Sequence, residues 1–471
     1  MDFTNWIKGR RGKEGVSVMQ NMVGQKIQGA LEKQTKYRWL VLSMIFLVYM
    51  IAGADRANIG VVVPFIKASF NMTNTDIGAM ASLFYLGYGL IQVPVGIIFT
   101  KYGVSKLFSL SLVLTSIATF FMGTATSVFQ LKLGRVILGF AEGPLNIGIL
   151  TTINRWFPPQ EKGIATGIFM SSIKFAPAVV PPLCAWIIIT FGWREVFYLF
   201  AIPGFILAGL WLWLVKDNPQ DSPYCSKFEL DYINNRQVDS GAVTGTAALK
   251  QVKSLRWLDK IIRTKKIQPL DTNRKVLLSW DVWGCALGYF FMVGITYAIM
   301  TWVPTYLITV KKFSIMKMGF VAAAPWVGAV LGNIIGGWLS DNFFDKRRKP
   351  VMLLTTVSTI FMMYSLIYSP NDPVLLATLL LSAGILLNLG YSTFLVYPMG
   401  IASKEQCPFA ASIIQTGGSL GGAFAPFVVG VLLDSFNWDM VFTFLAACSL
   451  ITFLILLTMI EPMEGYEETR E

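Results

Sequence analysis

Long apolar stretches alternate with short polar segments along almost the whole chain of 471 residues. A helix rises about 1.5 Å per residue, so about 20 apolar residues are enough to cross the hydrocarbon core of a bilayer. The stretches contain scattered Gly and Pro and lack the period-2 alternation of a membrane β-barrel. They predict an all-α polytopic membrane protein with 12 transmembrane helices, at 39–63, 77–99, 105–125, 129–153, 163–190, 195–215, 280–308, 317–340, 351–369, 373–397, 408–433 and 439–461.

One long polar stretch separates the predicted spans into two groups of six. The stretch before the first span is polar and basic, and it is too long and too polar for a cleaved signal peptide. We therefore divide the chain into an N-terminal tail (1–38), an N-terminal six-helix bundle (39–215), a linker (216–279), a C-terminal six-helix bundle (280–462) and a C-terminal tail (463–471).

Two sequence patterns recur in the two halves of the chain. The pattern F-x-W-x-x-V-F occurs as FGWREVF at 191–197 and as FNWDMVF at 436–442. The loop after the second span of each half contains another pair, GIIFTKYGVSK at 96–106 and GGWLSDNFFDKRR at 336–348. Because the copies occupy equivalent places, we predict two parallel six-helix halves. Parallel halves are typical of transporters that rock around a central binding site.

Basic residues lie mainly on one side of the predicted membrane. The tails, the linker and the loops on their side carry 30 Lys and Arg, whereas the opposite loops carry five. By the positive-inside rule, both termini and the linker are cytoplasmic, and we expect a multi-pass membrane protein with this orientation. The same asymmetry accounts for the net charge of +12, so we expect no nucleic-acid partner.

The composition limits the chemistry that the chain can perform. Only 14% of the residues are charged, against about 25% in soluble proteins. There is no His, and the five Cys are scattered without paired spacing. We find no nucleophile motif, nucleotide-binding loop or metal-ligand cluster, so we predict no enzyme activity, no cofactor and no metal. Any proton transfer depends on carboxylates, a lysine or a tyrosine.

Four basic residues fall within the predicted spans: Arg56, Lys132, Arg135 and Lys174. A charge at the bilayer centre costs about 2.5–3.5 kcal/mol on insertion scales, so such residues face the bundle interior or an aqueous cavity. Lys132 lies near a span end, where its side chain can reach the interface. For Lys174 we consider a second cationic contact to a substrate, or an ion pair with Glu142 or Asp55.

Asp55 and Arg56 stand side by side at the end of the apolar run 39–54. On a helix, adjacent side chains point about 100° apart, so the two cannot serve the same surface. Arg56 is expected to face the central cavity and to hold a carboxylate through two hydrogen bonds. Asp55 is expected to face a neighbouring helix and to change protonation as the cavity opens. The alternative is a charge pair at the outer end of the helix.

Arg135 and Glu142 lie seven residues apart on one face of the fourth span. One interpretation is an ion pair that holds helices together. The other is that Glu142 takes up and releases a proton, with Arg135 lowering its pKa in one conformation only. Gly139 and Gly143 predict close approach by a neighbouring helix. A second glycine set predicts that the eleventh span approaches the eighth or tenth: Gly417, Gly418, Gly421 and Gly422.

Polar side chains mark further candidate contacts. Tyr85, Tyr88 and Gln92 form a stripe at i, i+3 and i+7 in the second span. Tyr289 and Tyr297 lie about two turns apart in the seventh span. Such groups can bind the hydroxyls of a polyol, or they can be satisfied between helices.

Three segments carry a resemblance to a known family: DRANIG at 55–60, GRVILGFAEGP at 134–144 and TWVPTYL at 301–307. From about residue 38 to 462, the chain resembles the major facilitator superfamily and, within it, the anion:cation symporter family. The loop signature of the superfamily is present in the second half as Gly337, Asp341, Arg347 and Arg348. In the first copy, Thr100 replaces the aspartate. In the family this loop is thought to act as a latch on the cytoplasmic side, so the resemblance implies a weaker latch in the first half.

The resemblance is strongest to bacterial sugar-acid proton symporters of the galactonate type, and it implies a location in the bacterial inner membrane. It implies that the family arginine, here Arg56, binds the substrate carboxylate. It also implies that Asp55 and Glu142 couple protons to transport. The resemblance further places Ser392 and Gln415 at hydroxyl and amide contacts to the sugar, although relatives often have asparagine at the position of Gln415.

We therefore predict a secondary active transporter that moves an organic anion together with protons into the cytoplasm by alternating access. The expected substrate is a sugar acid such as a hexonate or a hexuronate, and the protein is expected to act as a monomer in the bilayer. Two alternatives remain: an organophosphate or other anion exchanger on the same fold, and a non-transporting sugar-acid sensor that signals through 216–279.

Overall fold

The computed structural model describes residues 35–234, 262–265, 267–345, 347–403 and 405–462. The predicted tails up to residue 34 and from residue 463, and the middle of the predicted linker, lie outside the described residues.

Long helices make up both halves of the chain. The first half contains α2 (Tyr37–Phe70), α3 (Asn74–Tyr102), α4 (Val104–Thr124), α5 (Val128–Trp156), α6 (Pro159–Thr190) and α7 (Trp193–Leu214). The second half contains α11 (Trp280–Thr309), α12 (Ile315–Trp338), α13 (Lys349–Ile367), α14 (Pro373–Asn388), α15 (Tyr391–Val396), α16 (Pro398–Ile401), α17 (Cys407–Ser435) and α18 (Trp438–Thr458). Within the described residues, eleven helical segments are long and apolar enough to cross a membrane. Helix α3, of 29 residues, packs against α5 in the same bundle. The all-α polytopic class is confirmed.

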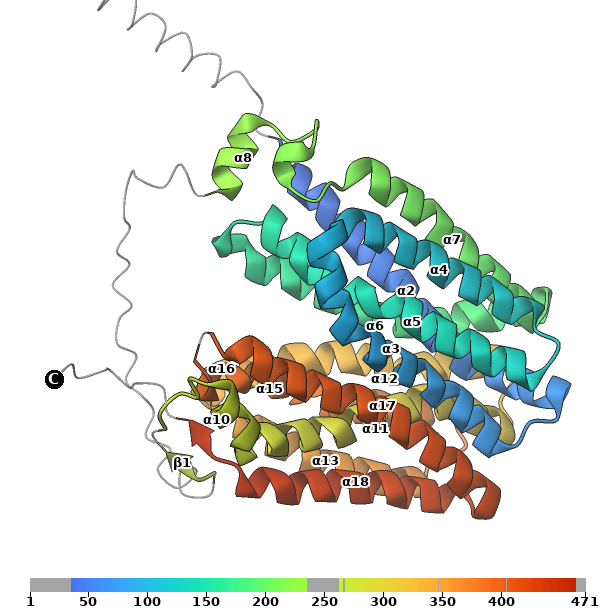
Figure 1. Ribbon diagram of the computed structural model, residues 1–471. Coiled ribbons are helices and arrows are strands. Elements are labelled where there is room, and N and C mark those ends of the chain that lie inside the picture. Colours follow the sequence, from blue (N-terminus) through green and yellow to red (C-terminus); the bar gives the residue numbers. More distant parts are fainter. Residues whose placement is uncertain (1–34, 235–261, 266, 346, 404, 463–471) are drawn as a thin grey trace, which may run out of the picture.

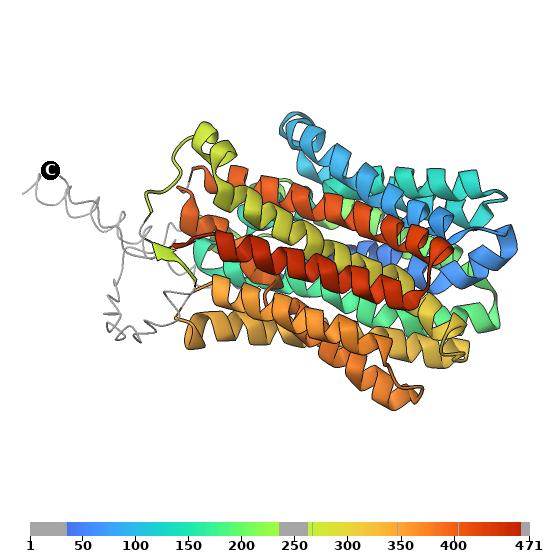
Figure 2. The ribbon, with the colours of Figure 1, turned by 90° about the horizontal axis from the view of Figure 1, so that it is seen from below.

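The helices of the two halves form two adjacent bundles whose helices run lengthwise between the same two ends of the molecule (Figures 1 and 2). The short elements α8 (Lys227–Ile233), α10 (Asn273–Leu278) and β1 (Thr264–Lys265) lie at one end, which we call the linker end; the opposite end is the far end. Across the boundary, α2 packs against α11, α3 against α17 and α6 against α12. Helices α3 and α12 are the second spans of their halves, and α6 and α17 are the fifth. The contacts of α3 with α17 and of α6 with α12 are therefore equivalent, as expected for two copies of one unit.

A carboxylate caps the third helix of each half at the linker end. Asp217, just after α7, accepts hydrogen bonds of 2.8 and 2.7 Å from two backbone N–H groups at the start of α4. Glu461 lies in β2 (Glu461–Pro462), just after α18, and accepts two bonds of 2.8 Å at the start of α13. Burial raises the pKa of the Glu461 carboxyl. These equivalent caps extend the internal repeat beyond the two sequence pairs.

Helix α2 continues past its predicted end at residue 63. It ends at Phe70, where Asn71 adopts a left-handed conformation with a φ of 50°. Asn tolerates this conformation and often ends a helix in this way. Asp55 and Arg56 therefore lie near the middle of a helix of 34 residues. The interpretation of a charge pair at the outer helix end is wrong.

The tenth span is not the single helix predicted over 373–397. Helix α14 ends at Asn388, and α15 begins at Tyr391. Between them, the Gly390 N–H donates to Thr355 Oγ1 at 2.6 Å, and a Cβ at Gly390 would press on the backbone of α13. Non-helical backbone at membrane depth is tolerated where protein buries it. Asn388, the last residue of α14, is buried, and Tyr391, the first residue of α15, is partly buried.

Glycines let two pairs of helices touch closely. Gly139 and Gly143 of α5 pack on α3, as predicted. For the eleventh span, the predicted partner is wrong: a Cβ at Gly417 or Gly421 of α17 would collide with the backbone of α11, the seventh span. Glycines four residues apart make a flat helix face, but their spacing does not specify which neighbour packs there.

Candidate substrate and proton site

Arg56 of α2 and Glu142 of α5 form an ion pair inside the first half. Arg56 Nε donates to Glu142 Oε2 at 2.8 Å. Arg56 is 6% exposed, and Glu142 is fully buried. Removing one partner of a buried pair leaves the other charge without compensation, at a cost of about 3–5 kcal/mol. The charge state of either residue therefore controls what the other can bind.

Three aromatic rings surround the guanidinium of Arg56. Its central carbon lies 5.3 Å from the ring centre of Tyr49, 5.7 Å from that of Phe84 and 5.1 Å from that of Tyr88. Such cation–π contacts hold the guanidinium in place without neutralising it. Among the described residues, Arg56 Nη2 and Glu142 Oε1 have no hydrogen-bond partner. The arginine thus keeps a donor for a further acceptor.

Arg135 of α5 lies close by but is bonded to a different group. Its Nη1 donates to the backbone carbonyl of Asp55 at 3.3 Å. In the part of the chain that the structure describes, the ion pair of Glu142 is with Arg56 and not with Arg135. Asp55 is buried, and its Oδ1 accepts from Asn58 Nδ2 at 3.4 Å. Two carboxylates and two arginines therefore share one interior region of α2 and α5.

Lys174 of α6 contacts the second half. Its Nζ donates to Asn388 Oδ1 at 3.1 Å and lies 4.1 Å from the ring centre of Tyr391. Neither of the ion pairs considered for it, with Glu142 or with Asp55, occurs among the described residues. Lys174 thus lies at the boundary between the halves.

Sequence reasoning missed three residues of the site: Tyr49, Asn388 and Tyr391. Tyr49 lies seven residues before Arg56, on the same helix face, and this spacing was a usable signal. Asn388 is an amide within an apolar run, which also marks it for an interior position. Nothing in the sequence placed Tyr391 beside Lys174, because that contact depends on the break at Gly390.

Tyrosines line the boundary between the halves near these charges. The ring centres of Tyr85 in α3 and Tyr297 in α11 are 4.2 Å apart. Those of Tyr289 in α11 and Tyr391 in α15 are 5.3 Å apart. Tyr297 lies within electrostatic range of both Arg56 and Tyr391. Three predicted tyrosines, one from α3 and two from α11, are therefore brought together here.

Three other predicted residues are partly buried: Gln92 in α3, Ser392 in α15 and Gln415 in α17. Their side chains form no hydrogen bond with another described residue. Their amide and hydroxyl groups therefore keep their hydrogen-bonding capacity. Within the described residues, no group of three or more Cys, Asp or Glu is arranged to hold a metal ion.

The two halves are joined at the far end. Asp434 of α17 accepts from the Asn74 N–H at 2.9 Å, the Thr75 N–H at 2.7 Å and the Thr75 hydroxyl at 2.6 Å. A Cβ at Gly60 or Gly78 would collide with the backbone of α11 or α17. Figure 1 shows the two bundles together at this end and diverging toward the linker end.

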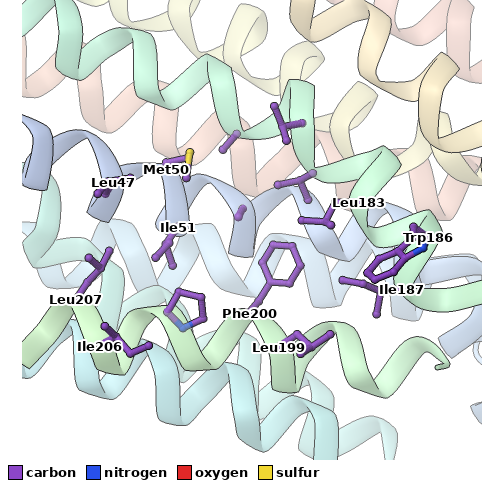
Figure 3. A pocket seen from close by; sticks show the side chains of 15 residues that line it. Leu47, Met50, Ile51, Leu183, Trp186, Ile187, Leu199, Phe200, Ile206 and Leu207 are labelled. Atoms are coloured by element: carbon purple, nitrogen blue, oxygen red, sulfur yellow. The ribbon is translucent and has the colours of Figure 1, made fainter. Parts of the chain in front are cut away.

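An apolar cavity of about 520 Å³ lies on another face of the first half, between α2, α6 and α7 (Figure 3). Its lining includes Leu47, Met50, Ile51, Leu183, Trp186 and Phe200. None of the charged residues of the site lines this cavity, although Ala54 does. A polyol needs hydrogen-bonding partners, so this cavity does not fit a sugar acid.

Comparisons with known proteins agree with this architecture. The family model of the Major Facilitator Superfamily matches residues 45–348 and 317–470. The probable galactarate/D-glucarate transporter GarP of Escherichia coli K12 is 29% identical over 453 residues, 92% of this chain and 97% of that protein. The D-galactonate transporter of Escherichia coli O6:H1 is 28% identical over 427 residues, covering 89% and 94%. A crystal structure of a bacterial homolog to the human lysosomal transporter Spinster, inward-facing and occupied, has a TM-score of 0.68 at 16% identity and covers 90% and 94%.

Proposed function

The chain belongs to the Major Facilitator Superfamily, and from this premise we propose that it imports a sugar acid together with protons. It is a multi-pass membrane protein of a transporter family, not an enzyme. We place it in the inner membrane with both termini and the linker in the cytoplasm. The distribution of 30 against five basic residues supports this orientation.

The relatives support a sugar acid as the substrate. They are named for transport of galactarate or D-glucarate and of D-galactonate. Each of these molecules combines carboxylate and hydroxyl groups. In this chain, Arg56 has a free donor. The rings of Tyr85 from the first half and Tyr297 from the second meet at the boundary, with their centres 4.2 Å apart. A carboxylate at Arg56 would leave the hydroxyls of the sugar near these tyrosines.

The observation that carries the proposal is the ion pair of Arg56 with Glu142. While Glu142 is ionised, it occupies a donor of the arginine. Protonation removes the negative charge of Glu142, and a substrate carboxylate can then bind the guanidinium through two parallel hydrogen bonds. Loss of the proton restores the ion pair and displaces the substrate. Asp55 supplies a second proton site, and Arg135 compensates the carboxylates when they are ionised.

The closed far end supports an inward-facing state. Asp434 holds the start of α3 against α17 there. With the linker end in the cytoplasm, the ionised pair represents the protein after it has released substrate and protons. The outward-facing state requires the contacts of Asp434 to break.

Transport into proteoliposomes tests the proposal. Aldonates, uronates and aldarates would be screened with purified protein and an imposed inward proton gradient. We expect at least one sugar acid to accumulate above equilibrium, and a protonophore to abolish that accumulation. Substrate exchange at a rate that the protonophore does not change would favour an anion exchanger. Binding without uptake would favour a sensor. If no sugar acid binds or enters, the proposal is wrong.

A further inference from the structure

Lys174 is a partly buried cation that, unlike Arg56 and Arg135, has no carboxylate near it among the described residues. Arg56 pairs with Glu142. Arg135 lies within electrostatic range of both Glu142 and Asp55. For Lys174, no carboxylate among the described residues forms an ion pair or acts electrostatically on the ammonium group. A cation at membrane depth without a counter-charge is unfavourable, so this position attracts an anion.

The neighbours of Lys174 are uncharged groups that can face a ligand. Its Nζ is bonded to the Asn388 amide oxygen at 3.1 Å and lies 4.1 and 6.0 Å from the ring centres of Tyr391 and Trp326. These three residues belong to α14, α15 and α12 of the second half. A single neutral acceptor leaves an ammonium group with donors for a stronger partner.

Arg56 and Lys174 lie on two helices that touch between them. A Cβ at Gly53 of α2 would lie 2.8 Å from the Cβ of Ala176 in α6. Both helices run from the linker end to the far end, with Arg56 three residues beyond Gly53 and Lys174 two residues before Ala176. At about 1.5 Å per residue, the backbone positions of the two cations are offset by about 7.5 Å along the bundle. That offset suits a short chain with a carboxylate at each end.

We propose that Lys174 binds a second substrate carboxylate, so that the preferred substrate is an aldarate, a sugar acid carboxylated at both ends. The inference rests on the proposed function, which assigns the first carboxylate to Arg56. The carboxylate at Lys174 would lie against Tyr391 of the second half. A dianion would therefore contact both halves at once, whereas a monoanion at Arg56 would leave Lys174 without a counter-charge.

Galactarate and galactonate provide a matched pair of probes, because they differ mainly in the number of carboxylates. Uptake of each would be measured in proteoliposomes containing wild type, Lys174→Met or Lys174→Arg. We expect wild type to favour galactarate. Loss of one charged hydrogen bond should raise the KM for galactarate about tenfold or more in Lys174→Met, with galactonate changed less than about threefold. Lys174→Arg should restore part of the galactarate affinity.

Lys132→Met is the matched control. Lys132 also lies in a span, but it is partly exposed and pairs with Asp76 at 2.7 Å, so its loss should affect neither substrate. Calorimetric binding of both probes to wild type and Lys174→Gln gives a second measurement if Lys174→Met does not fold. Equal losses for both probes would show that Lys174 only maintains packing, and would overturn the inference. Uptake of galactonate but not of galactarate by wild type would also overturn it and leave the proposed function standing. Absence of any sugar-acid binding would overturn both.

Discussion

Glu142 binds Arg56 and not the arginine of its own helix. The bond from Arg56 Nε to Glu142 Oε2 is 2.8 Å long, whereas Arg135 donates to a backbone carbonyl of α2. The carboxylate that we propose as the proton carrier is therefore in direct contact with the arginine that we propose to bind the substrate. Competition between a buried carboxylate and a substrate carboxylate for one guanidinium is a sufficient physical basis for coupling.

Glu142→Gln should remove one of the two protons that are coupled to transport. The amide has nearly the same shape as the acid, but it cannot change charge, so it leaves Arg56 permanently free for substrate. Substrate exchange under equal concentrations should continue. Accumulation driven by a pH gradient should fall by about tenfold for each pH unit of that gradient, because one coupled proton contributes this factor to the accumulation ratio. Glu161→Gln changes a carboxylate that pairs with Arg38 at the linker end, and this control should keep accumulation. Unchanged accumulation in Glu142→Gln would exclude this residue as a proton carrier.

Arg56→Ala should lower the stability of the wild-type protein more than it lowers the stability of a protein that already carries Glu142→Ala. The single change leaves a buried carboxylate without its partner, at a cost of about 3–5 kcal/mol. Arg56→Ala combined with Glu142→Ala removes both charges, and its loss should be smaller than the sum of the two single changes. Thermal unfolding of the four proteins in detergent measures this coupling. Strictly additive losses would mean that the ion pair contributes nothing to stability.

Asp55→Asn should lower the number of protons carried per substrate from two to one, because Asp55 and Glu142 are the buried carboxylates of the site. In wild type, a dianion with two protons moves no net charge, whereas a monoanion with two protons moves one positive charge. Reversal potentials in proteoliposomes measure both ratios. Uptake of an aldarate that depends strongly on membrane potential in wild type would contradict this stoichiometry.

Asp434→Ala should favour opening at the far end. The change removes the acceptor for two N–H groups and one hydroxyl at the start of α3. Spin labels at Ser69 and Phe436, both exposed at the far end, would report the separation of the halves in a background without the five native cysteines. We expect a larger population at long distance than in wild type.

Asp439→Asn is the control for this measurement. Asp439 is another exposed carboxylate at the far end, but its side chain forms no hydrogen bond to the first half among the described residues. The distance distribution of Asp439→Asn should match that of wild type. A matching distribution in Asp434→Ala would show that Asp434 does not hold the far end closed.

The fold was predictable because lipid imposes a strong local rule. Each span must be apolar for about 20 residues, and this requirement is readable from the chain alone. The ends of spans were less predictable, since α2 remains helical to Phe70 in a stretch that carries Lys67 and Ser69. The break before Tyr391 was also missed, because it depends on a hydrogen bond from Gly390 to Thr355 of another helix.

The interior position of the candidate residues was predictable for the same reason, but their partners were not. A charge within a span must avoid lipid, which selected Arg56, Arg135, Glu142 and Lys174 without any structure. The choice of Arg56 over Arg135 as the partner of Glu142 depends on how α2 and α5 pack, which helical spacing does not specify. The flat glycine face of α17 shows the same limit, because α11 and not α12 or α14 packs on it.

Hydrophobic and charge patterning by themselves determined the class of the protein, its two repeated halves and the set of ionisable side chains that cannot face lipid. The cost of transferring a residue from water to lipid depends mainly on that residue alone, so the sequence is enough to predict which residues avoid lipid. Only the tertiary structure decided that Glu142 neutralises Arg56, that Lys174 reaches Tyr391 and Asn388, and that the far end is closed. Those outcomes are pairwise distances between helices far apart in the chain, and packing of the whole bundle sets them.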